Sequence, residues 1–153
     1  PIAKISPVGL ALTKHYEGCV LKAYLCPEGV RTVGWGHTKT AVEGLTITTS
    51  MAEKLLLSDI YWAEEAVVKL VKVPLNQMKF DALVSFVFNL GENNFRKSTL
   101  LAYINVGKFQ EAAEEFTRWV RAGDVVLPGL VARRNDEESL FKGEIPTSIR
   151  VIA

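Results

Sequence analysis

The sequence lacks long apolar runs and a strong excess of either charge. A membrane span needs about 18 or more consecutive apolar residues, and no stretch of the chain approaches this. The formal net charge is +1, from 18 basic and 17 acidic residues. Residues 1–40 are mildly basic, but this falls short of the basic patch typical of nucleic-acid-binding domains. We therefore expect neither a membrane-spanning chain nor a nucleic-acid partner.

Cysteine and histidine are also scarce. The chain has two cysteines, Cys19 and Cys26, and two histidines, His15 and His37, whose spacing is not that of a zinc site. We expect no metal and no cofactor. Because the chain begins at Pro1 and not at a methionine, we also expect that a targeting or anchor segment could have been removed from it.

The first part of the chain favours a helix over residues 5–16. Ser6 can cap it, Pro7 suits its first turn, and Gly18 follows its end. The pattern then changes to that of a small β lobe. Turn residues stand at 27–29 and short strands are predicted at 32–36 and 45–48, which gives a hairpin or a three-stranded sheet.

Helical patterns take up the rest of the chain. Ser50 and Glu53 have the spacing of a capping box, and Pro74 ends that helix. Asn76 caps a helix that is apolar almost all round, which is typical of a central core helix. The predicted helices run over 50–72, 76–90, 98–104, 108–119 and 130–141, followed by a tail at 143–153. The fold class is α+β, and a cleft between the two lobes is the natural place for a ligand.

Reactive side chains concentrate in residues 16–38. This stretch holds Glu17, Cys19, Cys26, Thr32 and His37. We interpret it as an active-site hairpin. The remainder of the chain then serves as its scaffold.

The spacing within this stretch carries a family resemblance. Glu17 is followed by eight residues and Cys26, and then by five residues and Thr32. This resembles the catalytic signature of the phage-type lysozymes, the phage endolysins, in the subgroup that has Cys in place of the catalytic Asp. Similar segments are Tyr24, Gly34–Thr38, Phe80–Gly91, Phe95 with Ser98–Leu100, and parts of Gly129–Phe141. The resemblance runs from about residue 7 to about residue 142.

The resemblance implies one lysozyme-like domain over 1–153. Its small antiparallel β-hairpin lobe would cover about 19–48 and its larger helical lobe about 7–17 plus 49–142, with the active site in the cleft between them. It implies an endolysin, a muramidase that hydrolyses the β-1,4 bond between N-acetylmuramic acid and N-acetylglucosamine in bacterial peptidoglycan and so lyses the host cell. The expected partner is the glycan strand of peptidoglycan, and the expected oligomeric state is a monomer. The expected location is the host periplasm, or the host cytoplasm with release to the periplasm at lysis.

Glycoside hydrolysis needs an acid at the leaving oxygen and a second group on the opposite face of the sugar. Glu17 would be the acid, at a helix end whose carbonyls disfavour a negative charge. In relatives with Asp at the second position, that carboxylate and the Thr hold a water for inverting attack. Cys26 could be a thiolate base, a nucleophile or a helper of Thr32 in placing water, and we favour the last. The alternatives are a peptidoglycan-binding protein impaired in catalysis and a lytic transglycosylase on the same fold.

The two cysteines suggest a regulatory disulfide. Cys19 and Cys26 flank Val20–Leu25, which we interpret as turn-forming, and a bond between them would consume the Cys26 thiol. Some endolysins exported by a signal-anchor segment use this arrangement as a lock, which thiol exchange opens.

Four residues resemble positions that contact the glycan: Tyr24, Phe88, Ser98 and Arg133. Phe88 sits in an apolar run where core packing is the alternative. Arg133 and its neighbour Arg134 could instead form ion pairs within their own helix. We expect His37 to be structural and to bind an acid such as Asp59.

Overall fold

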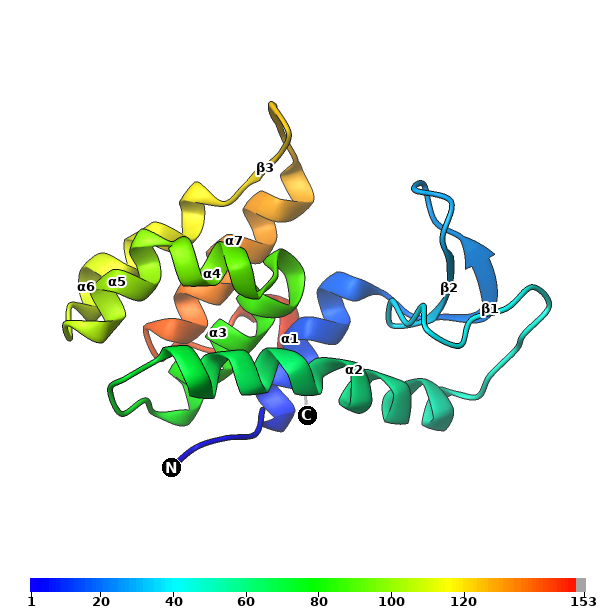
Figure 1. Ribbon diagram of the computed structural model, residues 1–153, viewed down its shortest axis with the longest axis horizontal. Coiled ribbons are helices and arrows are strands. Elements are labelled where there is room, and N and C mark those ends of the chain that lie inside the picture. Colours follow the sequence, from blue (N-terminus) through cyan, green and yellow to red (C-terminus); the bar gives the residue numbers. More distant parts are fainter. Residues whose placement is uncertain (151–153) are drawn as a thin grey trace. The chain divides into compact units, whose positions relative to one another are not determined.

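The computed structural model describes residues 1–150 (Figure 1) and combines, within that range, seven α-helices with two small antiparallel sheets. The chain divides into two compact units. One is Lys14–Tyr61, and the other joins Pro1–Thr13 to the chain from Trp62 onward. The α+β class is confirmed, while the single-domain assignment stays a prediction.

The unit Lys14–Tyr61 is built on one β-hairpin. It contains the end of α1 (Pro7–Glu17), strands β1 (Val20–Leu25) and β2 (Arg31–Gly34), and the first part of α2 (Thr49–Leu70). Val20–Leu25 is thus a strand, and the prediction of a turn-forming segment there was wrong. Residues 45–48 form no full strand, only a bridge between Lys22 and Thr46 with two flanking backbone hydrogen bonds.

The small core of this unit explains why β1 was missed. Only one residue of β1, Ala23, is buried, and it packs with Val33, Ile47 and Ala52. The other β1 side chains are exposed although most are apolar. The alternation that usually marks a half-buried strand is therefore absent from its sequence.

The second unit is organised around α3 (Gln77–Leu90), which is buried from Phe80 to Val87. This confirms the predicted central helix and its cap, because the Asn76 side chain accepts a hydrogen bond from the Lys79 N–H at 2.9 Å. Helix α3 packs against α7 (Pro128–Phe141). Between them in sequence come α4 (Glu92–Lys97), α5 (Thr99–Asn105), α6 (Phe109–Glu115) and the hairpin β3 (Arg121–Ala122)–β4 (Val125–Val126).

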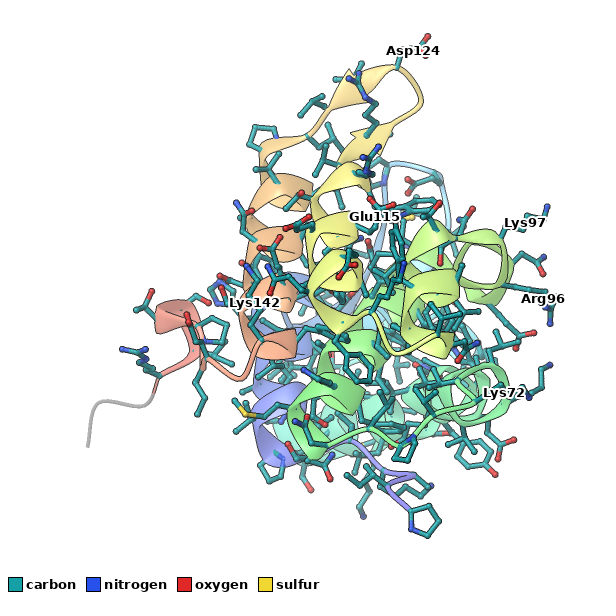
Figure 2. The ribbon with its side chains drawn as sticks, turned by 90° about the vertical axis from the view of Figure 1, so that its left-hand side faces the viewer. Lys72, Arg96, Lys97, Glu115, Asp124 and Lys142 are labelled. Carbon is teal, nitrogen blue, oxygen red and sulfur yellow. The ribbon has the colours of Figure 1, made fainter. Side chains whose placement is uncertain are left out.

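Several local predictions in these segments need correction. Helix α2 begins at Thr49 and is capped by Thr48, whose hydroxyl accepts from the Met51 N–H at 3.1 Å, so the capping box at Ser50 was wrong. Helix α7 begins at Pro128, two residues before the predicted start at residue 130. Helix α4 and the β3–β4 hairpin were not predicted. Figure 2 shows Asp124 at the tip of that hairpin, and Arg96 and Lys97 projecting from α4.

Polar contacts also tie the start of the chain into the second unit. The Ser6 N–H donates to Asp81 Oδ1 at 2.9 Å, and the Ile5 N–H donates to Glu64 Oε2 at 2.7 Å. The expected tail contains a short 3₁₀ helix at Thr147–Ile149, and its last three residues, 151–153, lie outside the described part of the chain.

Candidate active site

Glu17 ends helix α1 and lies against the loop after β2. It is half-buried, and Gly36 approaches it closely. A Cβ atom on Gly36 would stand 3.3 Å from Glu17 Oε1, and Gly36 has a φ of 79°. Glycine is the residue that adopts this left-handed backbone without cost.

The loop that carries Gly36 is fixed from both ends. Val33 and His37 exchange two backbone hydrogen bonds of 2.9 Å. His37 Nδ1 lies 2.7 Å from Asp59 Oδ2, as predicted, and His37 Nε2 accepts from the Thr40 N–H at 3.2 Å. Because a backbone N–H can only donate, Nε2 is the acceptor and Nδ1 carries the proton toward Asp59. His37 therefore has a structural role that holds the loop beside Glu17.

Cys26 and Thr32 are brought together by one backbone carbonyl. The Val30 oxygen accepts from the Cys26 N–H at 2.9 Å and from Thr32 Oγ1 at 3.0 Å. Thr32 is buried, with 5% of its surface exposed, and Tyr24 stands opposite it in the hairpin. Because the Thr32 hydroxyl donates its proton to the Val30 carbonyl, its oxygen keeps lone pairs that can accept a hydrogen bond from a water.

Glu28 lies two residues after Cys26, in the turn between β1 and β2, and is exposed. Hydrogen bonding to the Cys26 side chain, and after it to the Glu28 backbone N–H, holds the pKa of the Glu28 carboxyl below its ordinary value. The sequence analysis interpreted residues 27–29 only as a turn.

The two cysteines are free in the structure. Cys19 is exposed just before β1 and Cys26 is half-buried just after it. The six residues of β1 stand between them. The predicted disulfide therefore stays a prediction about another state of the protein.

The predicted glycan contacts have different environments. Tyr24 is 41% exposed on β1. Phe88 is half-buried, with its ring 6.0 Å from that of Trp62. Ser98 is buried and uses its hydroxyl as the cap of α5, accepting from the Leu101 N–H at 3.1 Å.

Arg133 is buried, with 3% of its surface exposed. It lies 3.2 Å from Glu137 Oε2 and also donates to the Ser85 carbonyl at 3.2 Å. Arg134 pairs with the same glutamate. The ion pair within α7, the second alternative, is thus present, and the glycan contact expected of Arg133 stays a prediction.

Comparison with known protein families identifies the family of this chain. The family model described as phage lysozyme matches residues 14–137. The chain belongs to the phage lysozyme family. The endolysin of Salmonella phage P22 is 41% identical over 146 residues, covering 90% of this chain and 97% of the relative. The endolysin of Acyrthosiphon pisum secondary endosymbiont phage 1 is 44% identical over 142 residues, with the same coverages of 90% and 97%.

A solved structure agrees with this assignment. The muramidase domain of SpmX from Asticaccaulis excentricus is 42% identical, with a TM-score of 0.87 over 92% of this chain and 98% of that one. This phage lysozyme is accordingly a glycoside hydrolase with the muramidase function of an endolysin. In its described residues no helix is both long and apolar enough to cross a membrane. The same residues contain no cluster of three or more His, Cys, Asp or Glu side chains that could hold a metal.

Proposed function

We propose that this endolysin hydrolyses the β-1,4 bond between N-acetylmuramic acid and N-acetylglucosamine in peptidoglycan, with Glu17 as the general acid. The supporting observation is the place of Glu17 at the end of α1, with its carboxylate beside Gly36. An acid fixed between a helix end and a tight loop can meet a glycosidic oxygen in one orientation. Its substrate would lie in the host cell wall, which places its action in the periplasm.

Cys26 and Thr32 are the proposed partners of Glu17 at the attacking water. Both are fixed through the Val30 carbonyl, and Thr32 keeps lone pairs for a water hydrogen bond. The second group of a glycosidase acts on the face of the sugar opposite the acid. We propose the water-placing role for Cys26, because its backbone N–H shares the Val30 carbonyl with the Thr32 hydroxyl.

Release of reducing ends from purified peptidoglycan tests the assignment of Glu17. Glu17→Gln keeps the size of the side chain and removes its proton, so the rate should fall by roughly 100-fold or more, the usual contribution of a general acid. Glu43→Gln, at an exposed glutamate in the same unit, is the matched control and should keep the wild-type rate. A Glu17→Gln protein with full activity would remove Glu17 from the mechanism, and anhydro products without reducing ends would replace hydrolysis by transglycosylation.

A disulfide between Cys19 and Cys26 is proposed as a means of inactivation in an oxidised form. A strand rises about 3.3 Å per residue, so β1 separates the two Cα atoms by a distance on the order of 20 Å. A disulfide requires them within about 7 Å. Bond formation therefore requires β1 to leave the hairpin. The pairing of Tyr24 with Thr32 would be lost with it.

A further inference from the structure

A pocket of about 390 Å³ lies at the end of α2, in the unit that joins Pro1–Thr13 to the chain from Trp62 onward. Residues of α2, of α3 and of the loop between these helices line it, among them Val67, Leu75 and Phe80. Among the described residues that line the pocket, Lys72 alone has a polar side chain. Sites for small molecules are of this size and are mainly apolar, with few polar groups. The pocket therefore has the composition of a ligand site.

Hydrogen bonds from outside the pocket hold its wall in place. The Asn105 side chain accepts from the Lys72 N–H at 2.7 Å and donates to the Leu70 carbonyl at 3.0 Å, which fixes the loop after α2. The start of the chain, which also lines the pocket, is bound through Ile5, whose N–H donates to Glu64 Oε2 at 2.7 Å. Ordering of loose segments is a large part of the cost of binding. A ligand would thus enter a site whose wall is already formed.

The Lys72 ammonium is available to an anionic group. Its Nζ donates to the Lys69 carbonyl at 2.7 Å. An ammonium has three N–H donors, so two are left for a ligand. Within residues 1–150, Lys72 forms no ion pair with a carboxylate. The pocket thus combines an apolar wall with one cation that has no counter-charge.

The chemistry of the wall selects among the possible occupants. A peptide brings a backbone N–H and C=O with each residue, and each of them needs a hydrogen-bond partner when it is buried. The side chains of the described wall offer a single donor group, that of Lys72. A hydrocarbon chain needs no such partner and gains free energy with each methylene that leaves water. A carboxylate at the end of that chain would complement the charge of Lys72.

We propose that this pocket binds a long-chain fatty acid, with its hydrocarbon chain against Val67 and Phe80 and its carboxylate at the Lys72 ammonium. Glu17 belongs to the other unit, so this is a second site, and the proposal does not depend on the function proposed above. A ligand that binds only the folded protein shifts the unfolding equilibrium toward the folded state. The fatty acid should therefore raise the melting temperature.

Calorimetric titration with sodium dodecanoate, below its micelle concentration, is the first test. We expect saturation at one molecule per chain. Decanoate, which is shorter by two methylenes, should bind roughly tenfold more weakly, because each buried methylene contributes about fourfold. The methyl groups of Val67 and Val71 should show the largest changes in NMR chemical shift. Absence of saturable binding, equal affinity for the two acids, or shift changes confined to residues outside the pocket would overturn the proposal.

The charge at the pocket is tested by Lys72→Gln. This variant should bind dodecanoate about threefold to fivefold more weakly, as expected for the loss of an exposed ion pair, and should bind dodecanol as tightly as wild type does. Lys97→Gln is the matched control, since Lys97 is exposed on the same side of the unit (Figure 2) and does not line the pocket. It should keep the wild-type affinity for dodecanoate. Equal affinities of the two variants would overturn the proposal.

The apolar wall is tested at Val68, which lines the pocket and is 52% exposed. Val68→Glu should keep the melting temperature of the ligand-free wild type, because the position is on the surface. Its carboxylate should repel that of the fatty acid and weaken binding by roughly tenfold. Val106→Glu, at a residue that is 68% exposed and lies outside the pocket, should bind as wild type does. Wild-type affinity in Val68→Glu would overturn the proposal.

Two other occupants would give different results. If a second copy of the chain covers the pocket, the wild type sediments as a dimer and Val68→Glu as a monomer. If a lipid bilayer is the partner, vesicles of phosphatidylglycerol bind the wild type and free dodecanoate does not. Either result would overturn the proposal, which expects a monomer that binds dodecanoate in the absence of vesicles.

Discussion

Replacing Gly36 by alanine separates the position of the Glu17 carboxylate from the stability of the loop beside it. Gly36 has a φ of 79°, and the new Cβ would stand 3.3 Å from Glu17 Oε1. The left-handed backbone should cost about 1–2 kcal/mol in the free energy of unfolding. The carboxylate must also move by a few tenths of an ångström. Since a misplacement of about 1 Å can cost about 100-fold in rate, we expect kcat to fall roughly tenfold.

Gly44→Ala is the matched control for this experiment. Gly44 lies in the same unit, is exposed like Gly36, and has a φ of 83°, but nothing lies within 4 Å of its added Cβ. Urea unfolding should therefore give a similar loss of stability in both variants. Reducing-end release should fall only in Gly36→Ala. Equal activity of the two proteins would refute the argument that Gly36 sets the place of the Glu17 carboxylate.

Two further predictions concern the cysteines and the buried charges. Protein oxidised to the Cys19–Cys26 disulfide should lose at least tenfold in activity and recover it with reductant, whereas Cys19→Ser should be insensitive. Full activity in protein shown by mass spectrometry to carry the bond would contradict this. Glu137→Gln should lower the free energy of unfolding by about 3–5 kcal/mol, because the buried guanidinium group of Arg134 loses the carboxylate with which it is paired. Glu138→Gln, which breaks only an exposed pair with Lys142, should cost less than about 1 kcal/mol in the same urea titration, and equal losses would contradict the burial argument.

The parts of the fold that follow from local chemistry were predictable from the sequence. Asn76 and Ser98 cap the helices expected of them, because a cap needs only a side-chain oxygen and a nearby N–H. Thr48 displaced Ser50 as the cap of α2, since two hydroxyl residues stood within one turn and only the path of the incoming chain decides between them. Element type was thus clearer than element boundary.

The candidate site, like the fold, was predictable from the sequence only in part. The spacing of Glu17, Cys26 and Thr32 is readable in one dimension, and so was the pairing of His37 with Asp59. The Val30 carbonyl that Cys26 and Thr32 share depends on the shape of the turn between β1 and β2, which the sequence does not specify. Arg133 was ambiguous for a different reason. Its charge favours the surface, and only the packing of α7 on α3 provides the buried glutamate that holds it inside.

The role of the Val30 carbonyl determines which substitutions the enzyme can accept at position 30. The group that fixes Cys26 and Thr32 belongs to the main chain, so every amino acid at position 30 supplies it. The Val30 side chain is 46% exposed. Sequence drift at this position can therefore change the surface next to the reacting groups without removing their shared acceptor, which makes it a suitable position for a fluorescent label or for adaptation to a different wall.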